Sequence, residues 1–432
     1  MSALDLRPGP PRDPLFQRGR KLLVVSVWVV GLAAAIGGVA LAVIAGGAGA
    51  AGLSIFYALI PVPILLAVFI WLDGYEREPR RYLAATFVWG AVGAVLIALA
   101  VQLPVQEIWD PSMRVSATYV APLSEEPAKG LILVLTLLRR RKVIDGIVDG
   151  FVYGGIAGLG FAFTENVLYY TSAYTSADDF DMPGALGATG TFFARGLMTP
   201  FLHPVFTTCF GVGLAMAVLA HRRFAKVVYP LVGLVVGMAV HGAWNAAAST
   251  QDPWWLLAAY AGVIAVLGGQ ITWALIARRN EGRVLWAALT DMAQRRGWLH
   301  VDEVPYLARL GLRGRARSYA RRTAGDPAAD AVRTYQRLAE TAAFLYDSVM
   351  RGRPKYGAVE RVDALRGGMT TLRPRLVLPP PVRIVKRLPR PVRPPAWGYP
   401  PPGGRHPGPP PGWQAPPQQG PVFPHHRPPG RR

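Results

Sequence analysis

Two adjacent glutamates, Glu125 and Glu126, lie inside an apolar run that is long enough to cross a bilayer. Lys129 follows three and four residues later, so on a helix it lies one turn from both carboxyl groups. A charge near mid-bilayer costs roughly 3 kcal/mol and usually marks a functional site. Two coupled carboxyl groups beside a lysine can leave one carboxylate able to accept a proton from water. The pair is therefore a candidate general base.

Further ionisable residues interrupt later apolar runs, namely Glu165, Arg195, His203 and His241. Counted at about 1.5 Å per residue, Glu126, Glu165 and the two histidines all fall at mid-membrane or in the outer half. A fold whose net stability is about 5–15 kcal/mol cannot carry several isolated charges in lipid. We therefore expect these side chains to lie together and to neutralise one another.

Prolines flank two of these positions. Pro122 and Pro127 bracket the glutamate pair, and Pro200 and Pro204 bracket His203. Each proline removes a helical hydrogen bond. Irregular backbone at membrane depth needs a protein-buried or water-lined cavity, so the pattern predicts broken helices around a hydrated site.

The residue types allow two chemistries, which the sequence leaves open. His203 and His241 could donate hydrogen bonds to an oxyanion while a glutamate activates water. Alternatively, they could bind zinc together with Glu126 or Glu165, as a three-ligand open site. The sequence lacks H-E-x-x-H, the helical motif of standard metalloproteases.

The composition indicates an all-α polytopic membrane helix bundle. Half of the 432 residues are hydrophobic, mean hydropathy is +0.25, and the apolar residues form runs of about 20. In lipid the backbone must satisfy its own hydrogen bonds, and these runs are too long for barrel strands. Cys209 is the single cysteine, so no intrachain disulfide can form. About eight spans are predicted, near 22–48, 53–72, 82–103, 113–138, 147–170, 190–220, 227–249 and 254–277.

The basic loops predict the orientation. Segments at 18–21, 139–142, 221–226 and 277–283 are rich in Lys and Arg and fall on one side if eight spans alternate. That side is cytoplasmic by the positive-inside rule, which places both termini in the cytoplasm of a multi-pass cell-membrane protein. The first span is longer than a signal-peptide core, which favours an anchor. Arginine-rich, lysine-poor usage is typical of a GC-rich bacterial genome.

Four regions follow from these patterns. Residues 1–21 form a cytoplasmic N-terminal segment, 22–277 the membrane-embedded domain, and 278–350 a small cytoplasmic amphipathic helical unit. Residues 351–432 are predicted to be a disordered, basic, proline-rich tail, with 16 Lys and Arg but only Glu360 and Asp363 as acids. The tail could bind anionic lipid headgroups or a cytoplasmic partner, or act as a soluble spacer. Nucleic acid is not a favoured partner.

Four short motifs resemble those of the PrsW family of intramembrane proteases, in the same order and on successive apolar runs. They are SEEPAKG at 124–130, GLGFAFTEN at 158–166, Arg195 eight residues before HPVFT, and HGAWN at 241–245. The resemblance covers about residues 50–277. It implies a catalytic set of Glu125, Glu126, Glu165, His203 and His241, with Lys129, Asn166, Arg195 and Asn245 as supporting residues.

The family is similar to the CAAX prenyl endopeptidase and bacteriocin-processing group. The resemblance implies a membrane-embedded endopeptidase of glutamate or metallo type, acting on a membrane-anchored substrate such as an anti-sigma factor or another single-span protein. Two other classes stay open. Buried charges and broken helices also occur in proton- or ion-coupled transporters, although no repeat relates spans one to four and five to eight. The second open class is a non-catalytic scaffold that recruits partners through its tail.

Overall fold

The computed structural model describes residues 46–139, 143–177, 182–250, 252–352 and 357–382. Within these ranges every regular element is a helix, in agreement with the predicted all-α class. The chain divides into two compact units, and the boundary falls at Glu281, inside helix α11. The predicted N-terminal segment 1–21, most of the first predicted span and residues 383–432 lie outside the described residues.

The membrane unit contains six helical stretches that are long and apolar enough to cross a membrane, so the chain is a multi-pass membrane protein. They are Gly46–Leu72, Arg80–Trp109, Ile147–Thr175, Gly184–Leu219, Arg223–Ala248 and Pro253–Gln294. The predicted fourth span is also helical, from Met113 to Arg139. It is absent from the six because Glu125, Glu126 and Lys129 lower its apolar character.

The described elements of this unit include three short π-helical stretches: η1 and η2 are continuous with the α-helices on both sides, and η4 continues α8 only. In chain order the elements are α2 (Pro61–Leu72), α3 (Arg80–Val88), η1 (Trp89–Ala94), α4 (Val95–Trp109), α5 (Met113–Val115), η2 (Ser116–Val120), α6 (Ala121–Arg139), α7 (Ile147–Thr175), α8 (Gly184–Phe192), η4 (Phe193–Met198), α9 (Leu202–Leu219), α10 (Arg223–Ala248) and α11 (Pro253–Gln294).

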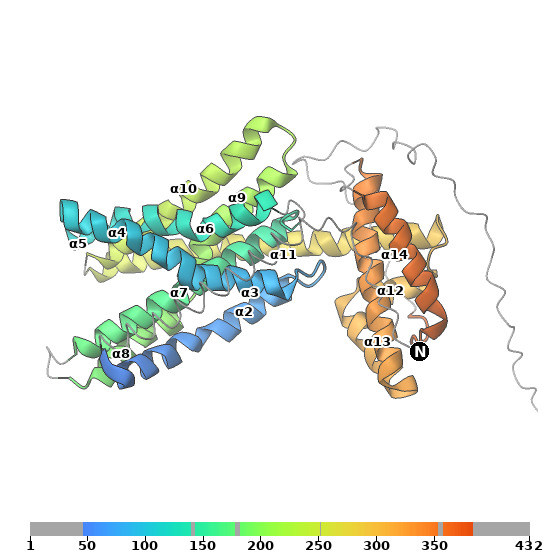
Figure 1. Ribbon diagram of the computed structural model, residues 1–432, viewed down its shortest axis with the longest axis horizontal. Helices are drawn as coiled ribbons and strands as arrows, with labels where there is room; N and C mark the ends of the chain where they lie inside the picture. Colours follow the sequence, from blue (N-terminus) through green and yellow to red (C-terminus); the bar gives the residue numbers. More distant parts are fainter. Residues whose placement is uncertain (1–45, 140–142, 178–181, 251, 353–356, 383–432) are drawn as a thin grey trace, which may run out of the picture. The chain divides into compact units, whose positions relative to one another are not determined.

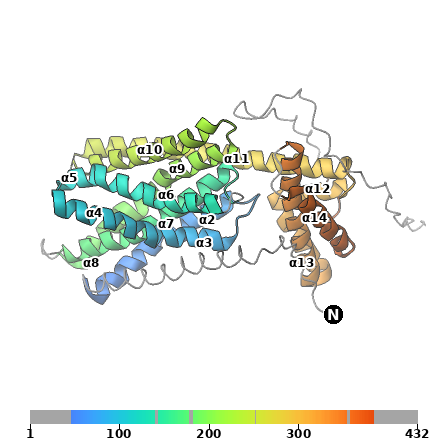
Figure 2. The ribbon, with the colours of Figure 1, turned by 45° about the horizontal axis from the view of Figure 1, so that its top comes forward.

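Helix α7 is the most buried element of the membrane unit. It contacts α2, α3, α6, α8 and α9, and the two ribbon views show it among them (Figures 1 and 2). Glycines allow the close approach: a Cβ on Gly150 would lie 2.5 Å from the carbonyl oxygen of Gly211, and one on Gly158 would lie 2.4 Å from that of His203. The packing of α7 on α9 thus sets the position of His203.

The prolines act differently in the two predicted breaks. The sixth predicted span is interrupted as expected, because η4 ends at Met198 and α9 begins at Leu202, with Pro200 between them. The fourth is not broken: α5, η2 and α6 run on without interruption, and Pro127 lies inside α6. The π-helical turn of η2 accommodates the altered hydrogen bonding there, a known adjustment in membrane helices.

The C-terminal unit is a small helical assembly. Its elements are the end of α11, η5 (Val301–Glu303), α12 (Val304–Ala308), α13 (Leu310–Met350), α14 (Ala358–Leu372) and η6 (Arg373–Arg375). Helix α13 is broken at Ala324 and Gly325, where the glycine has φ +78°.

Helix α14 corrects the predicted boundary of the disordered tail at residue 351. It packs against α13 and buries five side chains spaced three or four residues apart. That spacing places them on one helix face. Gly367, Gly368 and several arginines in the same stretch hide this pattern in the sequence. The buried residues are Ala358, Val362, Leu365, Met369 and Leu372.

The contact between α7 and α9 yields a stability prediction. Replacing Gly158 with alanine would drive a methyl group into the backbone of α9 at His203 and Pro204. Overpacking of this kind costs about 1–3 kcal/mol. Gly262→Ala on α11 is the matched control, because nothing lies within 4 Å of its added Cβ. Thermal unfolding in detergent should show a lower midpoint for Gly158→Ala only, and equal midpoints would contradict the packing described.

Candidate active site

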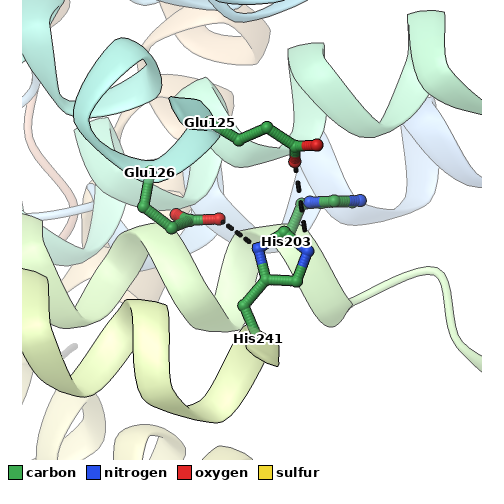
Figure 3. A group of neighbouring side chains, drawn as sticks. All are labelled: Glu125, Glu126, His203 and His241. Atoms are coloured by element: carbon green, nitrogen blue, oxygen red, sulfur yellow. Dashed lines mark hydrogen bonds and ion pairs between the residues drawn. The ribbon is translucent and has the colours of Figure 1, made fainter. Parts of the chain in front are cut away.

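Four buried side chains from three helices converge in the membrane unit. Glu125 and Glu126 project from one turn of α6 toward His203 of α9 and His241 of α10 (Figure 3). One nitrogen or oxygen atom from each residue lies within 4.8 Å of the others. Their exposed fractions are only 5%, 1%, 7% and 2%. The structure thus brings the two glutamates and both histidines together.

Lys129 lies at the centre of this group and is fully buried. Its ammonium donates to Glu125 Oε2 at 3.1 Å and to Glu126 Oε1 at 2.7 Å, and it lies 2.9 Å from His203 Nδ1. An ammonium has three hydrogens and no acceptor site, so Nδ1 of His203 must offer its lone pair. The side chain also lies 3.8 Å from the ring centre of Phe161, a cation–π contact.

The tautomer of His203 follows from that contact. Its other nitrogen, Nε2, carries the hydrogen and donates to Glu165 Oε2 at 2.6 Å. Arg195 donates to the same oxygen at 2.5 Å, and its Nε donates to Asn166 Oδ1 at 3.0 Å. The side chains of Glu165 and Arg195 are 18% and 27% exposed. These two are therefore the members of the group that are accessible from outside the protein.

His241 is held by Glu126. Its Nδ1 lies 2.9 Å from Glu126 Oε1, and its ring stacks on Phe206 with centres 4.7 Å apart. An ionised carboxylate only accepts hydrogen bonds, so Nδ1 carries the hydrogen and Nε2 keeps a lone pair. That Nε2 faces Glu125 Oε2 across 4.0 Å (Figure 3).

The two glutamates differ in how tightly they are held. Both oxygens of Glu126 are engaged, because Oε2 accepts from Thr207 Oγ1 at 2.9 Å. Glu125 has a longer contact at its Oε1, which accepts from Gln102 Nε2 at 3.3 Å. Neither Gln102 nor Thr207 was among the predicted site residues, although Thr207 ends the HPVFT motif, because the cost of burial was weighed only for ionisable side chains. Counting every polar side chain inside the spans would have found both.

Asn245, predicted as a supporting residue, lies one turn beyond His241 on α10. Its Nδ2 donates to the carbonyl oxygen of Ala117 in η2 at 2.9 Å. The contact joins α10 to the π-helical turn that precedes the glutamate pair. In this arrangement Asn245 positions two elements of the site.

The residue types at the site raise the question of a metal ion. Glu125, Glu126, His203 and His241 have the residue types and spacing to hold one. Glu165 lies outside this group, because its carboxylate contacts Nε2 of His203. However, three of the four candidate ligands already contact the Lys129 ammonium. With Lys129 in this position, the residues present do not fit a metal.

The part of the chain that resembles known proteins includes the helices that carry the site, α6, α7, α9 and α10. Residues 78–271 match the sequence profile described as PrsW family intramembrane metalloprotease. The chain is 35% identical over 123 residues to Protease PrsW of Clostridioides difficile (strain 630), covering 27% of this chain and 50% of the relative. It is 24% identical over 247 residues to Protease PrsW of Geobacillus kaustophilus (strain HTA426), covering 57% of this chain and 93% of the relative.

A third relative, Protease PrsW of Bacillus subtilis (strain 168), is 26% identical over 200 residues, with 45% of this chain and 83% of the relative covered. The chain thus spans half the length of the Clostridioides protein and most of the other two. No solved structure matches.

The hydrogen bond that the Thr207 hydroxyl donates to Glu126 yields a second prediction. Thr207→Val keeps the side-chain shape but leaves a buried carboxylate oxygen without its donor, which should cost about 1.5–3 kcal/mol. Thr207→Ser retains the hydroxyl and is the matched control. Unfolding midpoints in detergent should separate the two variants. Equal midpoints would mean that the hydroxyl does not hold Glu126.

Proposed function

We propose that this chain, whose residues 78–271 belong to the PrsW family of intramembrane proteases, hydrolyses a peptide bond of a membrane-anchored protein. One observation carries the proposal: two carboxylates and two imidazoles converge in a buried site, and each imidazole is oriented by a carboxylate. All of these residues lie within the matched range. The class of substrate is a single-span membrane protein.

Glu125 is assigned as the general base. Its Oε2 and Nε2 of His241 are 4.0 Å apart, which is too far for a direct hydrogen bond. A water between them could donate one hydrogen to each atom and direct an oxygen lone pair toward a substrate carbonyl. Glu126 is less suited, because it accepts three hydrogen bonds of 2.7–2.9 Å, from Lys129, His241 and Thr207. Glu125 accepts two longer ones, of 3.1 and 3.3 Å.

The steps balance with these groups alone. The water oxygen bonds to the carbonyl carbon while its proton passes to Glu125, which gives a tetrahedral oxyanion and a neutral carboxylic acid. The C–N bond then breaks, and Glu125 returns the proton to the leaving amine. The products are a carboxyl and an amino terminus, and Glu125 is ionised again. General base catalysis of this kind contributes about 10²–10⁴-fold in rate.

The other residues of the site hold Glu125 and His241 in place. Glu126 fixes the tautomer of His241, and Lys129 holds both glutamates. Glu165 and Arg195 are partly exposed, so we assign substrate entry to their side of the site.

Replacing the base tests the proposal. Glu125→Gln should lower the cleavage rate by about 10²-fold or more, because an amide cannot accept the proton. Glu126→Gln should also lower the rate, because an uncharged amide holds His241 and Lys129 less strongly than a carboxylate does. Glu107→Gln is the matched control, since Glu107 is an exposed glutamate on α4. All three proteins should still insert into the membrane.

The substrate can be sought in the same experiment. Membrane proteomes of cells that carry the wild type or Glu125→Gln are compared for single-span proteins that accumulate uncleaved. An accumulating protein is then co-reconstituted with purified enzyme in liposomes. Equal cleavage by wild type and Glu125→Gln would refute the assignment. Ion flux through wild-type liposomes without cleavage would instead indicate a transporter.

A further inference from the structure

We propose that the Lys129 ammonium is the resident cation of this site and occupies the position that a divalent metal would take. The inference deepens the proposed function, because it concerns the same side chains. It also predicts a specific change of chemistry: removing the ammonium should convert the site into a zinc site.

The first argument is geometric. Zinc binds carboxylate oxygen and imidazole nitrogen at about 2.0–2.2 Å. Nζ of Lys129 contacts an oxygen of Glu125, an oxygen of Glu126 and Nδ1 of His203 at 2.7–3.1 Å. A metal bound to those three atoms would be in contact with the ammonium and would repel it. The two cations therefore exclude each other.

The second argument concerns charge. Three carboxylates, Glu125, Glu126 and Glu165, face two basic side chains, Lys129 and Arg195. With the carboxylates ionised and the imidazoles neutral, these groups carry a net charge of −1. Loss of the ammonium would leave −2 in a buried site. A buried excess of that size must be compensated, either by protons or by a cation, and a divalent ion would find carboxylate and imidazole ligands already grouped there.

The third argument concerns the imidazoles. Metal-bound histidines usually donate their second ring N–H to a carboxylate or carbonyl, which fixes the lone pair on the other nitrogen. Both histidines already have this arrangement, His203 through Glu165 and His241 through Glu126. The lone pair of His203 faces Nζ of Lys129, and that of His241 faces Glu125. Both imidazoles are thus oriented as metal ligands are, but the Lys129 ammonium occupies the lone pair of His203.

Burial keeps the ammonium in place. Lys129 is 0% exposed and lies against the ring of Phe161. To admit a metal, it would have to abandon three hydrogen-bonding partners and enter packed protein or lipid, where an unpaired ammonium is strongly unfavourable. Zinc in the medium should therefore not displace it from the folded protein.

The test is zinc content, measured by elemental analysis of the full-length protein purified in detergent. Each sample is incubated with zinc sulfate and then freed of unbound metal by gel filtration. Wild type should retain no stoichiometric zinc. Lys129→Ala should retain about one zinc per chain, and a cobalt-loaded sample should show the visible absorption of a tetrahedral site. Lys129→Arg keeps the positive charge and should remain free of zinc.

Stoichiometric zinc in the wild type that is lost in His203→Ala would overturn the proposal, and that measurement does not depend on whether the Lys129 variants fold. A folded Lys129→Ala protein without zinc would overturn it too, and Lys129→Met, closer in volume, supplies a second variant. The cleavage assay is independent. A zinc-free wild type that cleaves nothing would refute the proposed function alone, whereas an active zinc-loaded wild type would refute this inference alone.

Discussion

The compensation of buried charge at Lys129 is the constraint on which the membrane unit depends. Three carboxylates at membrane depth would destabilise the bundle by several kcal/mol if left unpaired. The ammonium engages two of them, and Arg195 together with His203 engages the third. Because the partners come from α6, α7, η4 and α9, the charges also fix how these elements are arranged.

Close helix packing makes that arrangement possible. The glycines of α7 let the backbone of α9 approach until van der Waals contact, which brings His203 within reach of both Glu165 and Lys129. The hydrogen bond from Asn245 to Ala117 does the same for α10 and η2. Small residues and single polar contacts at helix interfaces are the usual means of association in membranes, where no hydrophobic force draws helices together.

Much of this could be predicted from the sequence, because membrane helices are long apolar runs and buried charges must neutralise one another. The same reasoning predicts that Glu125, Glu126, His203 and His241 lie in one group, as they do in the structure. It failed at Pro122 and Pro127, where the helix continues without a break: the π-helical η2 lies just before Pro122, Pro127 lies inside α6, and composition does not reveal π-turns. It also failed at α14, where glycines and arginines obscure the buried face. The central position of Lys129 needed three-dimensional distances.

The spacing of Lys129 from the glutamate pair also bears on how the protein is made. Helix α6 carries its own counter-ion at i+3 and i+4, so when it leaves the translocon it presents a net charge of −1 in place of three separate charges. Gln102 of α4 contacts Glu125, but the charged and imidazole partners of the site lie on α7, η4, α9 and α10, which are synthesised later. We therefore expect stable insertion of α6 to be completed late, after about a hundred further residues have been translated.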